Sequence, residues 1–171
     1  MDSLKAKIRS VPDFPKAGIT FFDITTLLRD REGFNATIDA IAKPFAGDPI
    51  DIVVGVESRG FILGGAVADR LNAGFAPVRK KGKLPSHAIR ETYDLEYGTD
   101  CLEIHSDAVE RGQRVLIVDD VLATGGTAAA TAALVRKLGG DIRALAFLIE
   151  LEFLPGRARL GSETIFSVLK Y

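Results

Sequence analysis

The stretch VLIVDDVLATGGT, residues 115–127, is the segment that most strongly indicates the fold. Its first four residues, Val115–Val118, are all apolar, which is typical of a strand covered on both faces of a parallel sheet. Two acids and a loop of small residues follow, and the chain then becomes rich in alanine until Gly139-Gly140. This order predicts a buried strand, a loop and a helix over about Gly126–Leu138.

The rest of the chain repeats the alternation of short apolar runs with helical patterns. The other strong strand candidates are Asp51–Val56, Phe75–Val78 and Ala144–Ile149, and helices are expected over Phe34–Phe45 and Phe61–Leu71. This alternation predicts an α/β fold with a central, largely parallel sheet flanked by helices. With 171 residues and no repeat or linker, residues 1–171 are expected to form one domain.

Two segments are expected to be peripheral to that sheet. Residues 1–28 precede the first strong strand and contain the rigid turn Pro12–Pro15. Residues 79–100 are polar, lack a clear period and carry Gly82, Pro85 and Gly98. The second segment is expected to be a hairpin or a mobile lid.

Composition favours a small-molecule partner. Lys plus Arg is 22 and Asp plus Glu is 23, so the net charge of −1 gives no general electrostatic footprint for nucleic acid. The single Cys101 cannot form an intramolecular disulfide, and no apolar run reaches the length of a membrane span. We therefore expect a cytoplasmic protein with no membrane or nucleic-acid partner. Two histidines and one cysteine provide no structural zinc site.

The loop after the strongest strand suits an anionic group. Backbone N–H groups at a helix start attract anions, and glycines let the backbone approach a ligand closely. No lysine follows the glycines, so the loop is not a Walker A motif. Asp119 and Asp120 precede it at the carboxyl end of the strand, where they can accept hydrogen bonds from a sugar diol. The loop residues are Ala123, Thr124, Gly125, Gly126 and Thr127.

Two more strand ends carry groups that bind anions. Strand 51–56 leads into Glu57-Ser58-Arg59-Gly60, where Arg59 can clamp an oxyanion or can pair with a surface carboxylate. Strand 75–78 leads into Arg79-Lys80-Lys81-Gly82-Lys83, a basic run that is otherwise typical of a solvated face. Taken together, the three strand ends describe a ligand with two separated anionic groups and a sugar diol between them.

These segments resemble those of a known family. VLIVDDVLATGGT is similar to the phosphoribosyl pyrophosphate signature of type I phosphoribosyltransferases. The matching segments of adenine phosphoribosyltransferases occur in the same order over nearly the whole chain, as PDFPKAGITFFDIT (12–25), VGVESRGF (54–61), RKKGKLP (79–85) and YDLEYG (93–98). The resemblance implies a type I phosphoribosyltransferase fold in which residues 1–28 form a hood and residues 79–100 a flexible lid.

The resemblance also implies roles for individual residues. Residues 123–127 would hold the 5-phosphate, Asp119 and Asp120 the ribose hydroxyls, and Glu57 with Ser58 and Arg59 the pyrophosphate. Arg79, Lys80 and Lys83 would contact pyrophosphate too, and a cis peptide is expected between Glu57 and Ser58. Phe21 and Val121 would sandwich the base beside Leu151, and a backbone acceptor near Thr20 or Phe22 would read its amino group. Glu96 would be the general acid/base, and Arg59 would stabilise departing charge.

The reaction implied is adenine plus phosphoribosyl pyrophosphate giving AMP and pyrophosphate. Mg²⁺ would be held mainly through pyrophosphate and ribose oxygens, with no protein metal site, and a homodimer is expected. Phe22 departs from the pattern, because some members carry Arg there, and Ser86–Thr92 matches no fixed pattern. Two alternatives remain open at this point: a phosphoribosyltransferase for 6-oxopurines, and a non-catalytic regulator that senses phosphoribosyl pyrophosphate.

Overall fold

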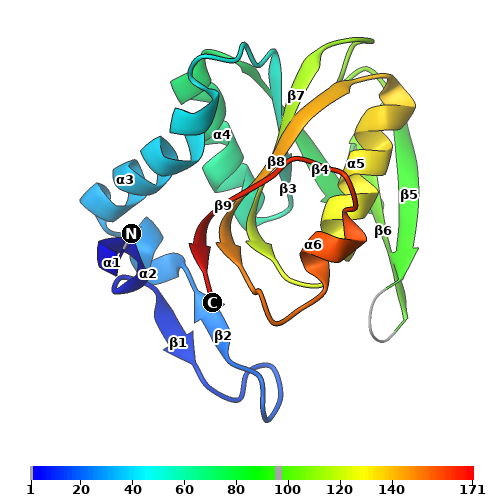
Figure 1. The fold of residues 1–171 in the computed structure, drawn as a ribbon. Coiled ribbons are helices and arrows are strands. Elements are labelled where there is room, and N and C mark those ends of the chain that lie inside the picture. Colours follow the sequence, from blue (N-terminus) through cyan, green and yellow to red (C-terminus); the bar gives the residue numbers. More distant parts are fainter. Residues whose placement is uncertain (1, 95–97) are drawn as a thin grey trace.

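A seven-stranded sheet forms the centre of the molecule (Figure 1). The computed structural model describes residues 2–94 and 98–171. The strand order is β5-β6-β4-β3-β7-β8-β9; the last five strands in this order are mutually parallel, whereas β5 and β6 are antiparallel additions. The strands are β3 (Ile52–Val56), β4 (Gly74–Lys80), β5 (Ala88–Asp94), β6 (Thr99–His105), β7 (Arg114–Leu122), β8 (Asp141–Glu150) and β9 (Ile165–Lys170).

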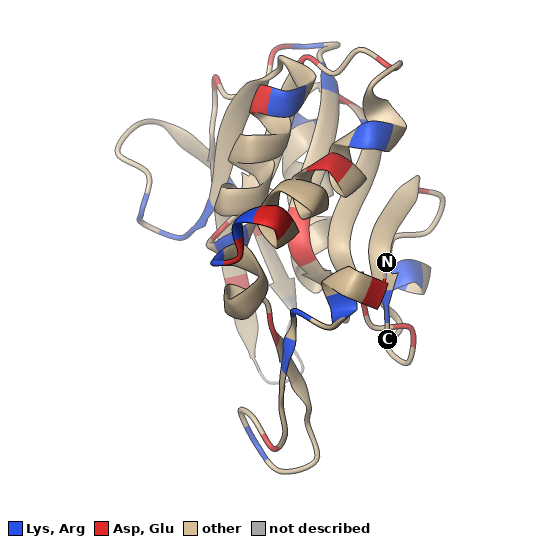
Figure 2. Cartoon of the chain, turned by 90° about the vertical axis from the view of Figure 1, so that its left-hand side faces the viewer, with Lys and Arg blue, Asp and Glu red and all other residues tan. Residues whose placement is uncertain are grey.

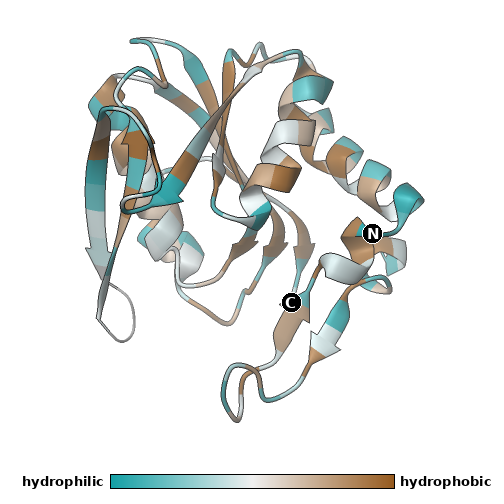
Figure 3. Ribbon diagram, turned by 180° about the vertical axis from the view of Figure 1, so that it is seen from behind, coloured by the Kyte–Doolittle hydropathy of each residue, from teal (hydrophilic) through white to brown (hydrophobic). Residues whose placement is uncertain are grey.

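Helices cover both faces of this sheet because its central strands are apolar on both sides. Val53 and Leu116 pack with α3 (Arg31–Ala42) and α4 (Arg59–Leu71) on one face. Their neighbours Val54 and Ile117 pack with α5 (Gly126–Leu138) on the other. In Figure 3 the central strands are mainly brown, the colour of hydrophobic residues, whereas the outer β5–β6 hairpin carries much teal. The predicted α/β fold with a central, largely parallel sheet is therefore confirmed.

The four predicted strands and three predicted helices all occur, with some different boundaries. The helix predicted over 34–45 begins at Arg31, because the Asp30 carboxylate accepts the Gly33 N–H at 2.6 Å, and its last turn is the 3-10 helix η1 (Lys43–Phe45). The helix predicted from Phe61 begins at Arg59. Strand β7 continues to Leu122, four residues further than predicted, because β8 pairs with it there.

The N-terminal segment builds a separate two-stranded sheet. It consists of β1 (Arg9–Val11) and β2 (Phe21–Asp23), which pair only with each other, flanked by α1 (Asp2–Lys5) and α2 (Thr25–Leu28). The hairpin projects from the body of the protein in Figure 1. Its base is fixed by the buried side chains of Ile24 and Leu27. We call residues 9–23 the hood hairpin.

The polar segment after β4 forms a hairpin, one of the two predicted forms. Strands β5 and β6 pair from Ala88↔His105 to Asp94↔Thr99. The hairpin lies against α5, where the ammonium of Lys137 donates to the Glu91 carboxylate at 2.5 Å. A last short helix, α6 (Gly156–Arg159), precedes β9. Within the described residues no helix is long and apolar enough to cross a bilayer. Figure 2 shows basic and acidic positions interspersed along the chain.

Candidate active site

The strands β3 and β7 separate at their carboxyl ends and open a crevice. Their pairing stops at Gly55↔Val118, whereas β7 stays paired with β8 as far as Leu122↔Glu150. From this point the chain leaves β3 for α4 on one face and leaves β7 for α5 on the other. Such a divergence is where open α/β sheets bind ligands.

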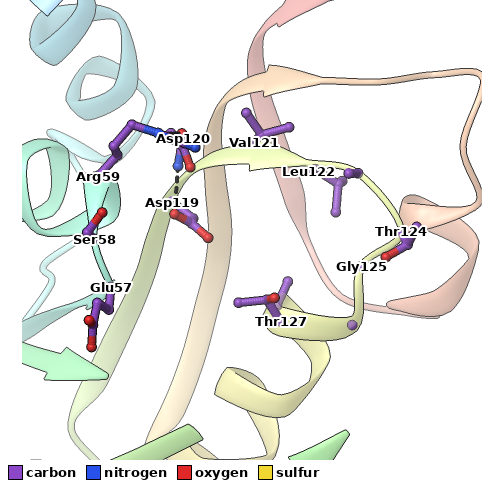
Figure 4. Close-up of a pocket in the computed structure, with 13 residues that line it drawn as sticks. Glu57, Ser58, Arg59, Asp119, Asp120, Val121, Leu122, Thr124, Gly125 and Thr127 are labelled. Atoms are coloured by element: carbon purple, nitrogen blue, oxygen red, sulfur yellow. Dashed lines mark hydrogen bonds and ion pairs between the residues drawn. The ribbon is translucent and has the colours of Figure 1, made fainter. Parts of the chain in front are cut away.

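A cavity of about 320 Å³ lies in this crevice. In Figure 4 the loop 57–59 lies across it from the loop 123–127, with Asp119 and Asp120 between them. The lining residues are Glu57, Ser58, Arg59, Asp119, Asp120, Val121, Leu122, Ala123, Thr124, Gly125, Gly126, Thr127 and Ala128. The structure therefore brings two of the three predicted strand ends to one cavity.

The loop 123–127 is shaped to present backbone N–H groups. Gly125 has φ of 79° and precedes α5 without any side-chain cap, so the first N–H groups of the helix remain available. The loop is braced from behind by Gly156: a Cβ on Gly156 would lie 2.2 Å from the Ala123 carbonyl oxygen. A negative group in the cavity would meet this helix N-terminus, which is a favourable anion site.

The two aspartates differ in their surroundings. Asp119 accepts the Asp120 N–H at 2.8 Å, and burial together with the charge of Asp120 raises the pKa of Asp119 well above its usual value. Asp120 forms an ion pair with Arg59 inside the cavity. Gly60 packs directly on Asp119, since a Cβ on Gly60 would lie 2.9 Å from the Asp119 Oδ1 atom. The start of α4 and the end of β7 are thus in contact.

Glu57 contacts basic residues at the end of β4 and just after it. Its carboxylate accepts the Lys80 N–H at 3.1 Å and the Arg79 Nε–H at 3.3 Å, and it is ion-paired with the Lys83 ammonium. Burial alone would raise the pKa of Glu57, but the hydrogen bonds from Lys83 and Lys80 outweigh it and lower the pKa below its usual value. The third strand end is therefore connected to the cavity through Glu57.

Hairpin β5–β6 is hydrogen-bonded to the rim of the same cavity. The Thr127 hydroxyl donates to the Tyr93 hydroxyl at 3.3 Å, and the Tyr93 hydroxyl donates to the Asp100 carboxylate at 3.4 Å. The Lys80 ammonium lies 3.4 Å from the same carboxylate oxygen of Asp100. A series of polar contacts through Tyr93 and Asp100 therefore joins the loop 123–127 to Lys80 at the end of β4.

Comparisons with known proteins identify the family to which this geometry belongs. The family model for the phosphoribosyl transferase domain matches residues 24–151. Adenine phosphoribosyltransferase of Acidobacterium capsulatum is 61% identical over 170 residues, which cover 99% of this chain and 94% of that protein. The chain belongs to the adenine phosphoribosyltransferase family.

Solved structures of adenine phosphoribosyltransferases match the fold over its full extent. The enzyme from Thermoanaerobacter pseudethanolicus superposes with a TM-score of 0.97 and 52% identity, covering 99% of each chain. The enzyme from Saccharomyces cerevisiae, solved with adenine and an imino-altritol 1,6-bisphosphate, has a TM-score of 0.93 and 42% identity over 98% of this chain and 97% of that one. The type I phosphoribosyltransferase fold is thus confirmed.

Some residues predicted from the adenine phosphoribosyltransferase resemblance line the cavity, and others lie outside its lining. Arg59 does pair with a carboxylate, but with Asp120 inside the cavity and not with one on the surface. The expected cis peptide between Glu57 and Ser58 is present. Arg79, Lys80 and Lys83 lie outside the lining and reach it through Glu57 and Asp100.

The predicted base-binding residues of this adenine phosphoribosyltransferase fold lie at different distances from the cavity, and of them Val121 belongs to its lining. The Phe21 ring centroid lies 5.5 Å from the Arg59 guanidinium. Leu151 is half-buried and donates its N–H to the Leu122 carbonyl, which holds it beside the loop. Thr20 is exposed in the hood hairpin. The Phe22 ring turns away and packs on Tyr171.

Glu96 lies outside the described residues, so its predicted role stays a prediction. Gly156 and Tyr93 support the cavity from outside, and the sequence patterns predicted neither role. Pro155-Gly156 was available as a turn signal, but the loop that Gly156 braces lies about thirty residues away in sequence. Tyr93 belongs to the family motif at 93–98, but that motif does not predict its contact with Thr127, because the contact depends on how the hairpin lies on α5.

The described residues contain no group of three or more His, Cys, Asp or Glu side chains placed to hold a metal ion. Asp119 and Asp120 nevertheless supply hard oxygen atoms beside an anion-binding loop. Mg²⁺ prefers oxygen ligands and commonly keeps several waters while binding substrate phosphates. The donor set therefore fits a magnesium ion that arrives with its phosphorylated substrate.

Proposed function

We propose that the chain is a purine salvage enzyme that transfers the 5-phosphoribosyl group of phosphoribosyl pyrophosphate to adenine, giving AMP and pyrophosphate. The observation that carries this proposal is the convergence of loop 123–127, the two aspartates and loop 57–59 on one cavity. Membership of the adenine phosphoribosyltransferase family supports the choice of adenine.

The ribose 5-phosphate part of the substrate is assigned to the β7–α5 connection. The 5-phosphate would accept hydrogen bonds from the N–H groups of residues 125–127. The ribose hydroxyls would donate to Asp119 and Asp120. Burial raises the pKa of Asp119 in the free protein. Hydrogen bonds from the ribose hydroxyls would stabilise the charged carboxylates and so oppose this effect of burial.

The pyrophosphate is assigned to loop 57–59 and the cations beside it. Breaking the bond from ribose C1 to pyrophosphate builds positive charge on the sugar and negative charge on the leaving group, as in glycoside cleavage. Arg59 would stabilise the departing oxygens, and Glu57 would keep Arg79 and Lys83 aimed at them. Mg²⁺, when bound with the substrate, would neutralise part of the pyrophosphate charge.

The base is assigned to the space between Val121 and the hood hairpin. Among the described strands β2 pairs with β1 alone, so within this part of the chain the N–H and C=O groups on its other edge have no strand partner. A carbonyl there, at Thr20 or Phe22, would accept from the adenine amino group, whereas a 6-oxopurine presents an oxygen acceptor at that position. Phe21 would stack on the base opposite Val121.

Proton transfer is assigned to Glu96. As the base nitrogen attacks ribose C1, a ring proton of adenine must leave, and a carboxylate at hydrogen-bond distance can accept it. Replacing Glu96 with Leu should lower kcat about a hundredfold or more, in line with general base catalysis, while phosphoribosyl pyrophosphate binding stays within about twofold. Unchanged turnover in Glu96→Leu would eliminate that role.

The remaining assignments concern the homodimer, the lid and the cellular compartment. Ile62 of α4 and Phe75 of β4 are 47% and 38% exposed, and the ring of Phe61, the neighbour of Ile62, lies 6.0 Å from the Arg79 guanidinium. A second copy covering them would give the homodimer and would bring its own surface close to Arg79 and Lys83. Residues 79–100 would act as a lid that excludes water during transfer. The single cysteine and the phosphorylated substrates fit a cytoplasmic enzyme.

The deciding experiment is product formation from phosphoribosyl pyrophosphate and Mg²⁺ with adenine, hypoxanthine or guanine in separate reactions. AMP formed only with adenine supports the proposal. IMP or GMP formed in preference would assign a 6-oxopurine enzyme. Binding of phosphoribosyl pyrophosphate without product from any base would assign a sensing regulator. Chelation of Mg²⁺ with EDTA should abolish product formation, and added Mg²⁺ should restore it.

A further inference from the structure

Strand β2 directs two consecutive phenylalanines to opposite sides, as successive residues of a strand always are. Phe21 faces the cavity side, where its ring centroid lies 5.3 Å from that of Phe14 and 5.5 Å from the Arg59 guanidinium. Phe22 faces the body of the protein. Its ring centroid lies 4.0 Å from that of Tyr171, with 35° between the ring planes.

Tyr171 is itself firmly held at the end of β9. Its N–H donates to the Glu150 carbonyl at 3.0 Å, and its carbonyl accepts the Glu152 N–H at 2.9 Å. The Lys5 ammonium lies 4.5 Å from the Tyr171 ring centroid and donates to the Lys170 carbonyl at 2.5 Å. The ring that Phe22 meets is therefore attached to the central sheet on one side and to α1 on the other.

The hood hairpin has few other attachments to the body. Its two strands pair only with each other, and residues 12–20 between them are exposed. Its base is anchored by Ile24, Leu27 and the bond from the Thr26 hydroxyl to the Lys7 carbonyl. Figures 1 and 3, viewed from opposite sides, both place the end of the chain after β9 beside β2. The Phe22–Tyr171 contact therefore joins the strand to the body on the side opposite to the Phe21–Arg59 contact.

We propose that Phe22 and Tyr171 are positioning residues whose ring contact fixes the hood hairpin over the base site. The inference rests on the proposed function, because it assigns the base to the space beneath β2. Neither ring faces the cavity. Their contact sets the height and tilt of β2, and with them the places of the Phe21 ring and of the free backbone edge that would read the base.

Weakening this ring contact should reduce the affinity for the base and leave the affinity for phosphoribosyl pyrophosphate unchanged. If the contact is weakened, the hood hairpin spends less time in the position that accepts the base, and the apparent affinity for the base falls by that fraction. The backbones of loop 123–127 and loop 57–59 are held by strands of the central sheet, and the Arg59 side chain meets the hairpin at Phe21. Phosphoribosyl pyrophosphate should therefore bind as before.

The test compares Phe22→Leu and Tyr171→Leu with the conservative variant Tyr171→Phe. Both Leu variants should raise the KM for adenine about three- to tenfold, the range expected on losing an aromatic pair, with the KM for phosphoribosyl pyrophosphate within about twofold of wild type. Tyr171→Phe keeps the ring and should behave as wild type. Amide hydrogen exchange across residues 9–23 should speed up in the Leu variants alone.

A milder variant guards against loss of folding. Lys5→Met removes the ammonium from the Tyr171 ring while keeping an apolar stem, and it should shift the adenine KM in the same direction by a smaller factor. A rise in both KM values together, or in neither, would overturn the inference. These results differ from failure of the proposed function, in which wild type itself makes no AMP from adenine.

Discussion

The hydroxyl oxygen of Thr127 lies 3.3 Å from that of Tyr93, so the first turn of α5 is hydrogen-bonded to a strand of the neighbouring hairpin. Tyr93 is in turn bonded to Asp100, which pairs with Lys80. Two regions assigned to opposite ends of the substrate are therefore linked through one tyrosine. Burial raises the pKa of Tyr93, so its hydroxyl keeps the proton it donates throughout the neutral range.

Tyr93→Phe tests that link. Losing a hydrogen bond of this kind costs about 0.5–1.5 kcal/mol, so the KM for phosphoribosyl pyrophosphate should rise about two- to tenfold while the KM for adenine changes little. Steady-state kinetics with each substrate varied in turn measure the difference. Tyr171→Phe, which removes a hydroxyl remote from Thr127, is the matched control. An unchanged KM for phosphoribosyl pyrophosphate would show that the hydroxyl does not support Thr127.

Gly156→Ala should displace the loop 123–127. The added Cβ would lie 2.2 Å from the Ala123 carbonyl oxygen, which is backbone and cannot move aside cheaply. Such overpacking costs about 1–3 kcal/mol, and the KM for phosphoribosyl pyrophosphate should rise with it. Denaturant unfolding and kinetics are the measurements. Gly47→Ala, where a Cβ meets nothing within 4 Å, is the control; equal behaviour of the two variants would contradict the bracing role.

Asp119→Asn should stabilise the ligand-free protein while impairing turnover. The pKa of Asp119 is raised above its usual 3.8, so the native state holds a proton that the unfolded state has lost. Stability from this group is complete below pH 3.8 and is lost as the pH rises through the raised native pKa. Denaturant unfolding at pH 8 should therefore show the Asn variant to be more stable than wild type, with the gap closing on acidification. Asp107→Asn, in an exposed loop, should show no such gain.

Arg59→Lys should lower kcat/KM for phosphoribosyl pyrophosphate about tenfold or more although the charge is kept. The guanidinium pairs with Asp120 while lying over the Phe21 ring, and an ammonium cannot offer the same planar fork to both. Arg70→Lys, on the exposed part of α4 where Arg70 pairs with Asp39, is the matched control. Equal kinetics for wild type and Arg59→Lys would mean that position 59 contributes only a point charge.

The sequence predicted the centre of this fold because its signals are local. Val115–Val118 is apolar at every position and fully buried, and the bounds of α5 follow from the glycines at both of its ends. The same locality explains why loop 123–127 and the two aspartates could be predicted as one site. All of these residues lie within one strand–loop–helix unit.

What the sequence did not predict depends on contacts between distant segments. Strand β9 was not predicted, because an edge strand with a polar residue at Ser167 lacks the uniform apolar character of Val115–Val118. The side to which Phe22 turns is decided by Tyr171, about 150 residues later in sequence. The grouping of Arg79, Lys80 and Lys83 around one carboxylate likewise depends on how β4 lies beside β3.

The close packing of Gly60 on Asp119 has a consequence for the span of the ligand. Because the start of α4 already touches the end of β7, loop 57–59 and loop 123–127 cannot move closer together to suit a shorter molecule. On the proposed assignment, a sugar whose two anionic groups are one carbon too close together would reach one loop but not both. We therefore expect the length of a phosphorylated sugar, as well as its charge, to decide whether it binds.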